Sequence, residues 1–244
     1  MAAAFDLLDR RIQKFIWQAG WASLRPVQEM AIPVIVQGGR DVIVAASTAA
    51  GKTEAAFFPA LTRLLRQPGL LVYISPLKAL INDQQGRLQV LCGQLDLPVY
   101  PWHGDIAAPS KARFMQQPQG VLLITPESLE AMLCSKGTQI KRLFGNTRCF
   151  IIDELHAFIG SERGKQLQAI MHRIDMEVGT PVARVGLSAT LGDMGLAAEF
   201  LRPGNGQNVE ILNAPSTGNS LKVLIKGYEE PTPMTMSSAA TVDS

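Results

Sequence analysis

Short, continuous apolar runs alternate with longer helical stretches along most of this chain, and this alternation constrains the fold more than any other feature. The predicted strands lie at residues 41–45, 70–75, 99–102, 120–125, 149–153, 182–188 and 221–227. The predicted helices lie at residues 52–66, 77–91, 109–116, 126–134, 162–178 and 193–201. Strands without a polar face must be covered on both sides. The pattern therefore predicts a doubly wound α/β domain with a mostly parallel sheet and helices on both faces.

Polar residues follow five of these predicted strands, at the point where the strand ends. They are Ser47 and Thr48, Ser75, Thr125, Asp153 and Glu154, and Ser188 and Thr190. In doubly wound folds, ligands bind beyond the carboxyl ends of the strands. Five such groups on one edge of the sheet outline a site.

Composition is neutral about partners, because the formal net charge of +2 does not indicate a nucleic-acid binder by bulk charge. The three cysteines are widely spaced and form no CxxC or Cys/His cluster, so neither a zinc site nor a disulfide framework is supported. No signal peptide is visible, and every apolar run falls well short of the ~20 residues that a membrane span needs. We expect a cytoplasmic protein without a membrane segment.

A phosphate-binding loop is predicted between the first strand and the helix that follows it. It consists of Ala46, Ser47, Thr48, Ala49, Ala50, Gly51, Lys52 and Thr53. Backbone N–H groups in such a turn bind β- and γ-phosphates, with Lys52 adding a charge and Thr53 offering its hydroxyl to Mg²⁺. The first glycine of the usual pattern is replaced by Ala46, which fits the turn if its φ stays negative. The alternative is an ordinary strand–turn–helix junction.

Two carboxylates, Asp153 and Glu154, end the apolar run at residues 149–153. An aspartate here reaches Mg²⁺ through water in P-loop enzymes, and Glu154 is placed to polarise a water that attacks the γ-phosphate. Taken alone, the pair is a helix N-cap and His156 a structural histidine. The preceding phosphate-binding loop favours an ATPase.

Six segments together resemble the first RecA-like domain of superfamily-two DExH-box helicases, most closely the Lhr-like and Ski-like groups. Residues 24–28 resemble the Q motif, with Phe5 upstream, and residues 46–53 resemble motif I. Motifs Ia, Ib, II and III are resembled by residues 75–84, 125–128, 153–156 and 188–190. The ordered set is specific, whereas each motif alone is weak.

The resemblance implies a role for each matching residue. Gln28 would bind the adenine edge, and Phe5 would stack on the base or serve as a core residue. His156, Ser188 and Thr190 would couple the ATP site to the strand site. The groove for single-stranded or partly duplex nucleic acid would be lined by Pro76, Lys78, His103, Gly104, Thr125, Pro126 and Arg163. Lys78 and Arg163 are equally well explained as solvated charges on helix surfaces.

The second RecA-like domain of this family, with arginines that face the γ-phosphate, has no counterpart in these residues. We expect residues 1–228 to form the first domain and residues 229–244, which are rich in Pro, Ser and Thr, to form a tail or linker near an interdomain hinge. The expected function is the ATP- and Mg²⁺-binding half of a DNA or RNA helicase. The main alternative is a nucleotide-dependent switch or adaptor without motor activity. A transport or remodelling ATPase is disfavoured because its signature segments are missing.

Overall fold

The computed structural model describes residues 3–47, 50–106, 108–189 and 193–214. Its central feature is a seven-stranded sheet in the order β3-β4-β2-β5-β6-β1-β7, in which every neighbouring pair is parallel. The strands are β1 (Val42–Ala45), β2 (Leu70–Ile74), β3 (Val99–Trp102), β4 (Gly120–Ile124), β5 (Thr147–Ile152), β6 (Ala183–Ser188) and β7 (Glu210–Asn213). The predicted parallel α/β architecture is confirmed.

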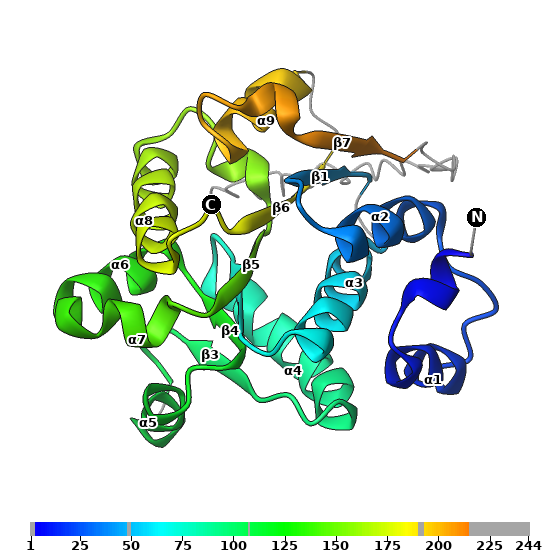
Figure 1. Ribbon diagram of the computed structural model, residues 1–244, viewed down its shortest axis with the longest axis horizontal. Helices are drawn as coiled ribbons and strands as arrows, with labels where there is room; N and C mark the ends of the chain where they lie inside the picture. Colours follow the sequence, from blue (N-terminus) through cyan, green and yellow to red (C-terminus); the bar gives the residue numbers. More distant parts are fainter. Residues whose placement is uncertain (1–2, 48–49, 107, 190–192, 215–244) are drawn as a thin grey trace, which may run out of the picture.

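Helices cover both faces of the sheet (Figure 1). They are α1 (Arg10–Gln18), α2 (Pro26–Gln37), α3 (Lys52–Arg66), α4 (Lys78–Gln94), α5 (Ala108–Gln116), α6 (Pro126–Ser135), α7 (Ile140–Phe144), α8 (Glu162–Val178) and α9 (Met194–Leu201). Short 3₁₀ turns are η1 (Ala4–Leu7), η2 (Gly137–Gln139), η3 (Leu155–Ala157) and η4 (Gly206–Asn208).

The sheet separates two hydrophobic cores because alternate side chains of each strand point to opposite faces. On β2, Leu71 and Tyr73 belong to the core beneath α1–α4, whereas Val72 and Ile74 belong to the core beneath α6–α9. Both sets are almost fully buried. The continuous apolar runs thus reflect strands that are covered on both sides.

Local signals set several helix boundaries. The predicted helices at residues 52–66 and 162–178 are found with these bounds. Helix α8 begins where the Ser161 side chain accepts from the backbone N–H of Gly164 and ends at Gly179, whose φ is 83°. Strand β7 was not predicted. The apolar run expected to form a strand at residues 221–227 lies outside the described residues.

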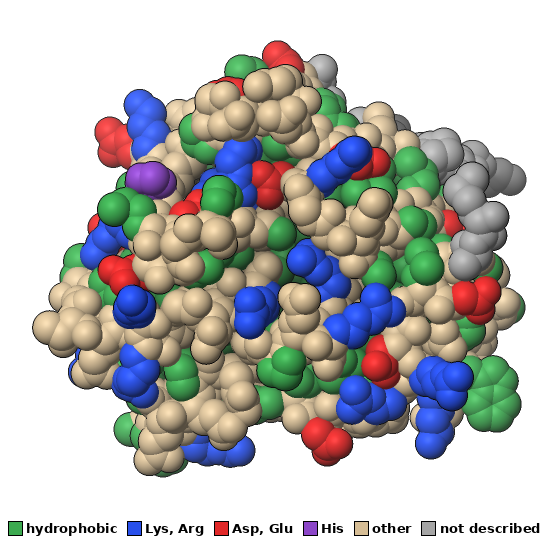
Figure 2. Space-filling model, viewed as in Figure 1, with side chains coloured by type: hydrophobic (Ala, Val, Ile, Leu, Met, Phe, Trp, Pro, Cys, Tyr) green, Lys and Arg blue, Asp and Glu red, His purple; other side chains and the backbone are tan. Residues whose placement is uncertain are grey.

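The edge at which the strands begin is held by a buried ionic network. Arg184 donates to Asp175 at 2.6 Å, and Arg202 bonds both Asp41 and Asp175. Figure 2 views the molecule from this edge, where Lys and Arg side chains are scattered. The polar residues predicted from the ends of the strands lie on the opposite edge wherever the structure describes them: Ser47, Ser75, Thr125, Asp153, Glu154 and Ser188.

Candidate functional site

The phosphate-binding loop joins the end of β1 to the start of α3. Gly51 precedes α3 with φ 90° and ψ 28°, a left-handed conformation that suits glycine. The backbone N–H of Ala50 donates to the Ser47 carbonyl at 3.2 Å, which closes a turn. Thr48 and Ala49 lie outside the described residues. A helix of 15 residues therefore points its N-terminus, with its unpaired N–H groups, at this loop.

Ala46, at the usual glycine position, fits the loop without strain. Among the described non-glycine residues, positive φ angles occur at Asp96 and Glu154 and not at Ala46. The methyl group of Ala46 is buried, with 2% of the residue exposed. The condition set from the sequence, a negative φ at this position, is confirmed.

Ser188 ties the loop to β6. It pairs with Ala45 in the sheet, and its carbonyl accepts from the N–H of Ala46 at 3.3 Å. The Ser188 hydroxyl is fully buried without a hydrogen-bond partner among the described residues. The predicted coupling residue therefore contacts the start of the phosphate-binding loop. Thr190 lies outside the described part of the chain.

Lys52 folds back onto the loop that precedes it. Its Nζ donates to the carbonyls of Ala46 at 2.7 Å and Ser47 at 3.0 Å. Burial lowers the pKa of Lys52, while the nearby carboxylates of Glu154 and Asp153 partly oppose this shift. The ammonium group thus lies within electrostatic reach of both predicted acids. These acids follow β5, whereas the phosphate-binding loop follows β1.

Asp153 follows β5 and is buried, with 8% of the residue exposed. Its Oδ2 accepts from the Tyr73 hydroxyl, and its Oδ1 accepts from the Glu154 N–H at 3.0 Å. Burial raises the pKa of Asp153, and the hydrogen bond from Tyr73 opposes that rise. Burial and the neighbouring carboxylate raise the pKa of Tyr73, so this hydroxyl remains a donor.

Glu154 has φ 46° and ψ 49°, a left-handed conformation that costs energy for a residue with a side chain. Its Oε2 lies 3.4 Å from Nδ1 of His156, and both side chains are about two-fifths exposed. The unusual backbone turns the chain out of β5 directly after Asp153. The exposed Glu154 carboxylate is therefore free to meet water, as the predicted role requires.

Gln28 contacts the phosphate-binding loop from α2. Its Oε1 accepts from the Arg25 N–H at 2.9 Å, and its Nε2 donates to the Gly51 carbonyl at 3.4 Å. The residue is fully buried. Phe5 lies farther out, on a cavity of 370 Å³ that it shares with Trp17, Trp21 and other side chains. The adenine contacts expected of Gln28 and Phe5 stay predictions.

The predicted strand-binding residues gather around the start of α4. Lys78 lies 3.3 Å from Asp105, and Gly104 adjoins the Lys78 ammonium group. His103 is 3% exposed, and its Nε2 lies 2.9 Å from Oδ1 of Asn82. The histidine side chain therefore positions α4 against the loop after β3, and little of it reaches solvent.

Arg163 joins two of the predicted groove segments. It donates to the Pro76 carbonyl at 2.7 Å and forms a forked ion pair with Glu127 of α6. Thr125 caps α6 by accepting from the Ser128 N–H at 3.3 Å, and Pro126 occupies the first helical position. The arginine thus holds the loops that follow β2 and β4 side by side.

A family profile described as "DEAD/DEAH box helicase" matches residues 25–196, which is most of the chain. The chain belongs to the DEAD/DEAH box helicase family. It is 36% identical over 198 residues to the "Lhr helicase/uracil glycosylase" of Escherichia coli, covering 71% of this chain and 12% of that protein. It is 32% identical over 206 residues to the "ATP-dependent helicase Lhr-Core" of Sulfolobus acidocaldarius, covering 78% of this chain and 23% of that protein.

Solved structures agree with this assignment. The structure of "Mycobacterium smegmatis helicase Lhr bound to ssDNA and AMP-PNP" matches with a TM-score of 0.75 and 31% identity, over 88% of this chain and 28% of that one. The DEAD-box helicase Mss116 shares the fold, with a TM-score of 0.75 at 19% identity. The predicted RecA-like helicase domain is confirmed. The chain spans about a quarter or less of the length of these Lhr proteins.

The oxygen groups of this helicase domain suit Mg²⁺, which prefers one or two carboxylates together with phosphates and water. Within the described ranges, no group of three or more His, Cys, Asp or Glu side chains forms a self-sufficient metal site. A hydroxyl from Thr53 and a carboxylate from Asp153 fit an ion that takes its remaining ligands from nucleotide and water.

Among the residues that the structure describes, no helix is long and apolar enough to cross a membrane.

Three residues of the helicase site escaped the sequence reasoning: Tyr73, Asp105 and Glu127. Tyr73 carried a signal, since it is a hydroxyl in the otherwise apolar strand Leu70–Ile74 and buried tyrosines usually bond a partner. Glu127 lies in the segment that resembles motif Ib, although no role was assigned to it, and Asp105 carried no signal because exposed carboxylates are common.

Proposed function

We propose that this chain is the nucleotide- and strand-binding half of an ATP-dependent helicase motor. The observation that carries the proposal is the convergence of Lys52, Asp153 and Glu154 at one edge of the sheet, beside a loop that begins α3. Motor activity of the whole protein would require the second RecA-like domain of the family, which would follow residues 1–228.

Each group at this edge has a task in ATP hydrolysis. The N–H groups of the loop and Lys52 bind the β- and γ-phosphates, while Thr53 and Asp153 hold Mg²⁺, which supplies positive charge to these phosphates when bound. Glu154 orients the water whose oxygen attacks the γ-phosphorus, and the bond to the β-phosphate oxygen breaks to leave ADP and phosphate. Lys52 must first exchange its two carbonyl partners for phosphate oxygens.

The strand-binding residues would hold the sugar–phosphate backbone without reading the bases. Lys78 and Gly104 supply a cation and a close backbone approach, and Thr125 and Pro126 begin a helix whose N-terminus favours phosphate. Ser188 and His156 would transmit the state of the nucleotide, because Ser188 bonds the phosphate-binding loop and His156 adjoins Glu154.

An arginine from the second domain would complete the nucleotide site, and in related NTPases such a residue is worth roughly 10³–10⁵ in rate. Residues 1–228 taken alone should therefore bind nucleotide and hydrolyse it slowly. The backbone contacts proposed here do not distinguish DNA from RNA, since that distinction needs contacts to the 2′-hydroxyl. We further propose that the protein acts in the cytoplasm.

The alternative, a nucleotide switch without motor activity, does not explain the predicted strand-binding residues at this edge of the sheet. A switch needs the phosphate-binding loop but has no need of the Lys78, Gly104 and Thr125 cluster. Membership of the helicase family favours the motor as well.

Titration calorimetry with ATP·Mg²⁺, in the presence and absence of single-stranded DNA and RNA, tests the proposal. We expect either DNA or RNA to strengthen nucleotide binding severalfold. The one that does so is the nucleic acid along which the helicase moves. Nucleotide binding that is indifferent to both polynucleotides would support the switch and contradict the motor.

A further inference from the structure

A cavity of 510 Å³ lies at the edge of the sheet where the strands begin. It is bordered by residues that precede β1, begin β5 and β6, end α3 and follow α9. Four arginines line it, namely Arg40, Arg63, Arg148 and Arg202, whereas Asp41 is the one carboxylate among its described lining residues. The candidate nucleotide and strand sites lie at the opposite edge and share no residue with this cavity.

The carboxylates at this edge neutralise some of its arginines but not all of them. The buried ionic network described above holds two arginines and two aspartates, so it is neutral as a whole. Arg40 pairs with Glu210 at 3.3 Å. Among the described residues, Arg63 and Arg148 form no ion pair. The cavity therefore carries two positive charges that no neighbouring carboxylate compensates.

A β-bulge places Arg148 at the cavity. Thr147 and Cys149 pair with consecutive residues of β2, so Arg148 between them is an extra residue in β5. Such a bulge takes a side chain out of the regular alternation of the strand and gives it a new direction. The Nε and Nη2 of Arg148 donate to the Pro68 carbonyl, both at 3.3 Å. Its Nη1 donates to none of the described residues and is available to a ligand.

Both uncompensated arginines are held against glycines. A Cβ on Gly38 would lie 2.6 Å from Cζ of Arg63, and a Cβ on Gly69 would lie 2.8 Å from Nε of Arg148. Burial raises the pKa of the Cys149 thiol to about 12, and the charge of Arg63 opposes that rise, so Arg63 acts on the part of β5 that carries Arg148. The guanidinium group of Arg63 bonds none of the described residues. Its donors are thus positioned but unused, and binding a ligand would cost little side-chain entropy.

We propose that this cavity binds a phosphate dianion, either free or as the terminal monoester of a larger molecule, through Arg63 and Arg148. A guanidinium group presents a rigid fork of donors that matches phosphate oxygens. Two such groups balance a phosphate monoester, whose charge is about −2 near neutral pH, whereas each diester of a nucleic-acid backbone carries a single negative charge. The volume of the cavity falls in the range of small-molecule sites, so there is also room for the group that carries the phosphate.

Isothermal titration calorimetry of the full chain with methyl phosphate tests the proposal, in a phosphate-free buffer of constant ionic strength without Mg²⁺ or nucleotide. Dimethyl phosphate is the matched control, because it is similar in shape and carries one negative charge. We expect inorganic phosphate to compete with methyl phosphate, and dimethyl phosphate to bind roughly tenfold more weakly because it loses a charge-assisted hydrogen bond. Equal binding of monoester and diester would favour a nucleic-acid backbone and overturn the dianion site. No binding of any probe would mean that the arginines are solvated surface charges.

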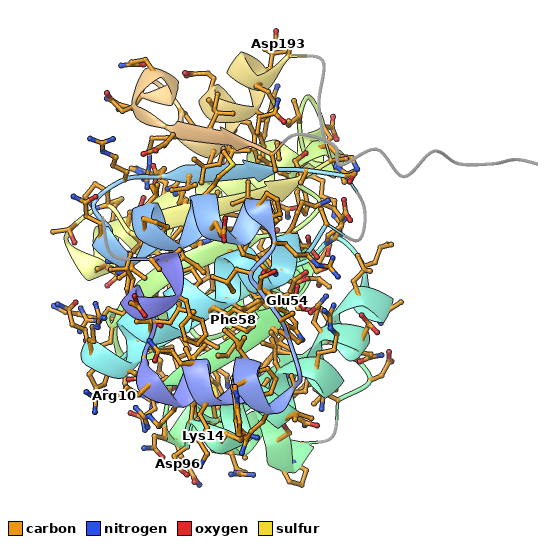
Figure 3. All side chains as sticks on the ribbon, turned by 90° about the vertical axis from the view of Figure 1, so that its right-hand side faces the viewer. Arg10, Lys14, Glu54, Phe58, Asp96 and Asp193 are labelled. Carbon is orange, nitrogen blue, oxygen red and sulfur yellow. The ribbon has the colours of Figure 1, made fainter. Side chains whose placement is uncertain are left out.

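Substitutions locate the bound phosphate. Arg63→Gln and Arg148→Gln should each weaken methyl phosphate binding roughly tenfold. The matched control is Arg10→Gln, which removes an exposed charge on α1 (Figure 3) and should change nothing. Methyl phosphate should still bind to Lys52→Ala, because Lys52 lies at the opposite edge. Binding that is lost in Lys52→Ala and retained in both cavity variants would place the phosphate in the phosphate-binding loop and refute the proposal. Circular dichroism checks that each variant is folded.

Discussion

The hydroxyl of Tyr73 donates a hydrogen bond to the buried carboxylate of Asp153. Tyr73 lies on β2, and Asp153 follows the neighbouring parallel strand β5, 80 positions later in the sequence. The ring of Phe57, from the helix that follows the phosphate-binding loop, packs on Tyr73 with centroids 5.5 Å apart. A continuous contact thus links α3 to the acid that we propose as a metal ligand, and it fixes the orientation of that acid.

Substitution Tyr73→Phe should keep the packing and leave Asp153 with one oxygen unpaired. We expect the free energy of unfolding to fall by about 1–3 kcal/mol, the cost of a buried unsatisfied acceptor, and the Mg²⁺ dependence of nucleotide binding to weaken. Urea unfolding and calorimetry measure the two effects. The matched control is Tyr100→Phe, which removes only a long 3.5 Å bond to the Gln117 carbonyl and should change neither. Equal effects of the two variants would contradict the assignment.

Substitution Asp153→Asn should stabilise the protein at neutral pH while it removes function. Burial raises the pKa of Asp153, so the folded state binds this proton more tightly than the unfolded state. The wild-type stability from this group is therefore complete below the ordinary aspartate pKa of about 3.9 and is lost as the pH rises through the raised value. Urea unfolding without metal or nucleotide should show a gain for the variant at pH 7 that disappears near pH 3. An equal gain at both pH values would refute this account.

Substitution Gly51→Ala should destabilise the phosphate-binding loop by two effects. The left-handed backbone costs a residue with a side chain about 1–2 kcal/mol, and a Cβ here would lie 2.7 Å from Nε2 of Gln28. Gly39 also has a positive φ, of 80°, but nothing lies within 4 Å of its Cβ position. Thermal or urea unfolding should show a larger loss for Gly51→Ala than for Gly39→Ala. Equal losses of unfolding free energy in the two variants would mean that the close approach of Gln28 to Gly51 has no energetic effect.

The ion pair between Lys78 and Asp105 makes a prediction about salt dependence. If Lys78 contacts one phosphate, Lys78→Ala should weaken binding of a single strand and reduce the slope of log K against log salt by about 0.7. Asp105→Asn should strengthen binding a few-fold, because it frees Lys78. Fluorescence anisotropy over a range of salt concentrations measures both. An unchanged slope in Lys78→Ala would mean that Lys78 is a solvated surface charge that does not contact the nucleic acid.

Strands β1 to β6 and their shared edge were predicted because buried parallel strands have continuous apolar runs. Strand β7 was missed because Glu210–Asn213 contains only two apolar residues, lies at the border of the sheet and is only partly buried. Helices α1 and α2 were not assigned either, although Asp9 caps α1 and Pro26 begins α2.

The location of a candidate site residue was predictable where it depends on the residue's place after a strand, as for Lys52 and Asp153. It was not predictable where a role depends on distant partners. Arg163 reads as a solvated charge, yet it binds Glu127 and the Pro76 carbonyl, 36 and 87 positions away. His103 reads as a groove residue, yet burial leaves it 3% exposed. Pairings of this kind come from the fold, and local patterns do not encode them.

The central claim is that Lys52 binds the phosphates of ATP at the edge where β1 and β5 end. Titration calorimetry of ATP·Mg²⁺ against Lys52→Ala, with the exposed Lys141→Ala of α7 as the matched loss of one charge, tests it most directly. The account predicts that Lys52→Ala loses nucleotide affinity by at least tenfold, the equivalent of about 1.4 kcal/mol, while Lys141→Ala binds as the wild type does. Unchanged binding in Lys52→Ala would contradict the account.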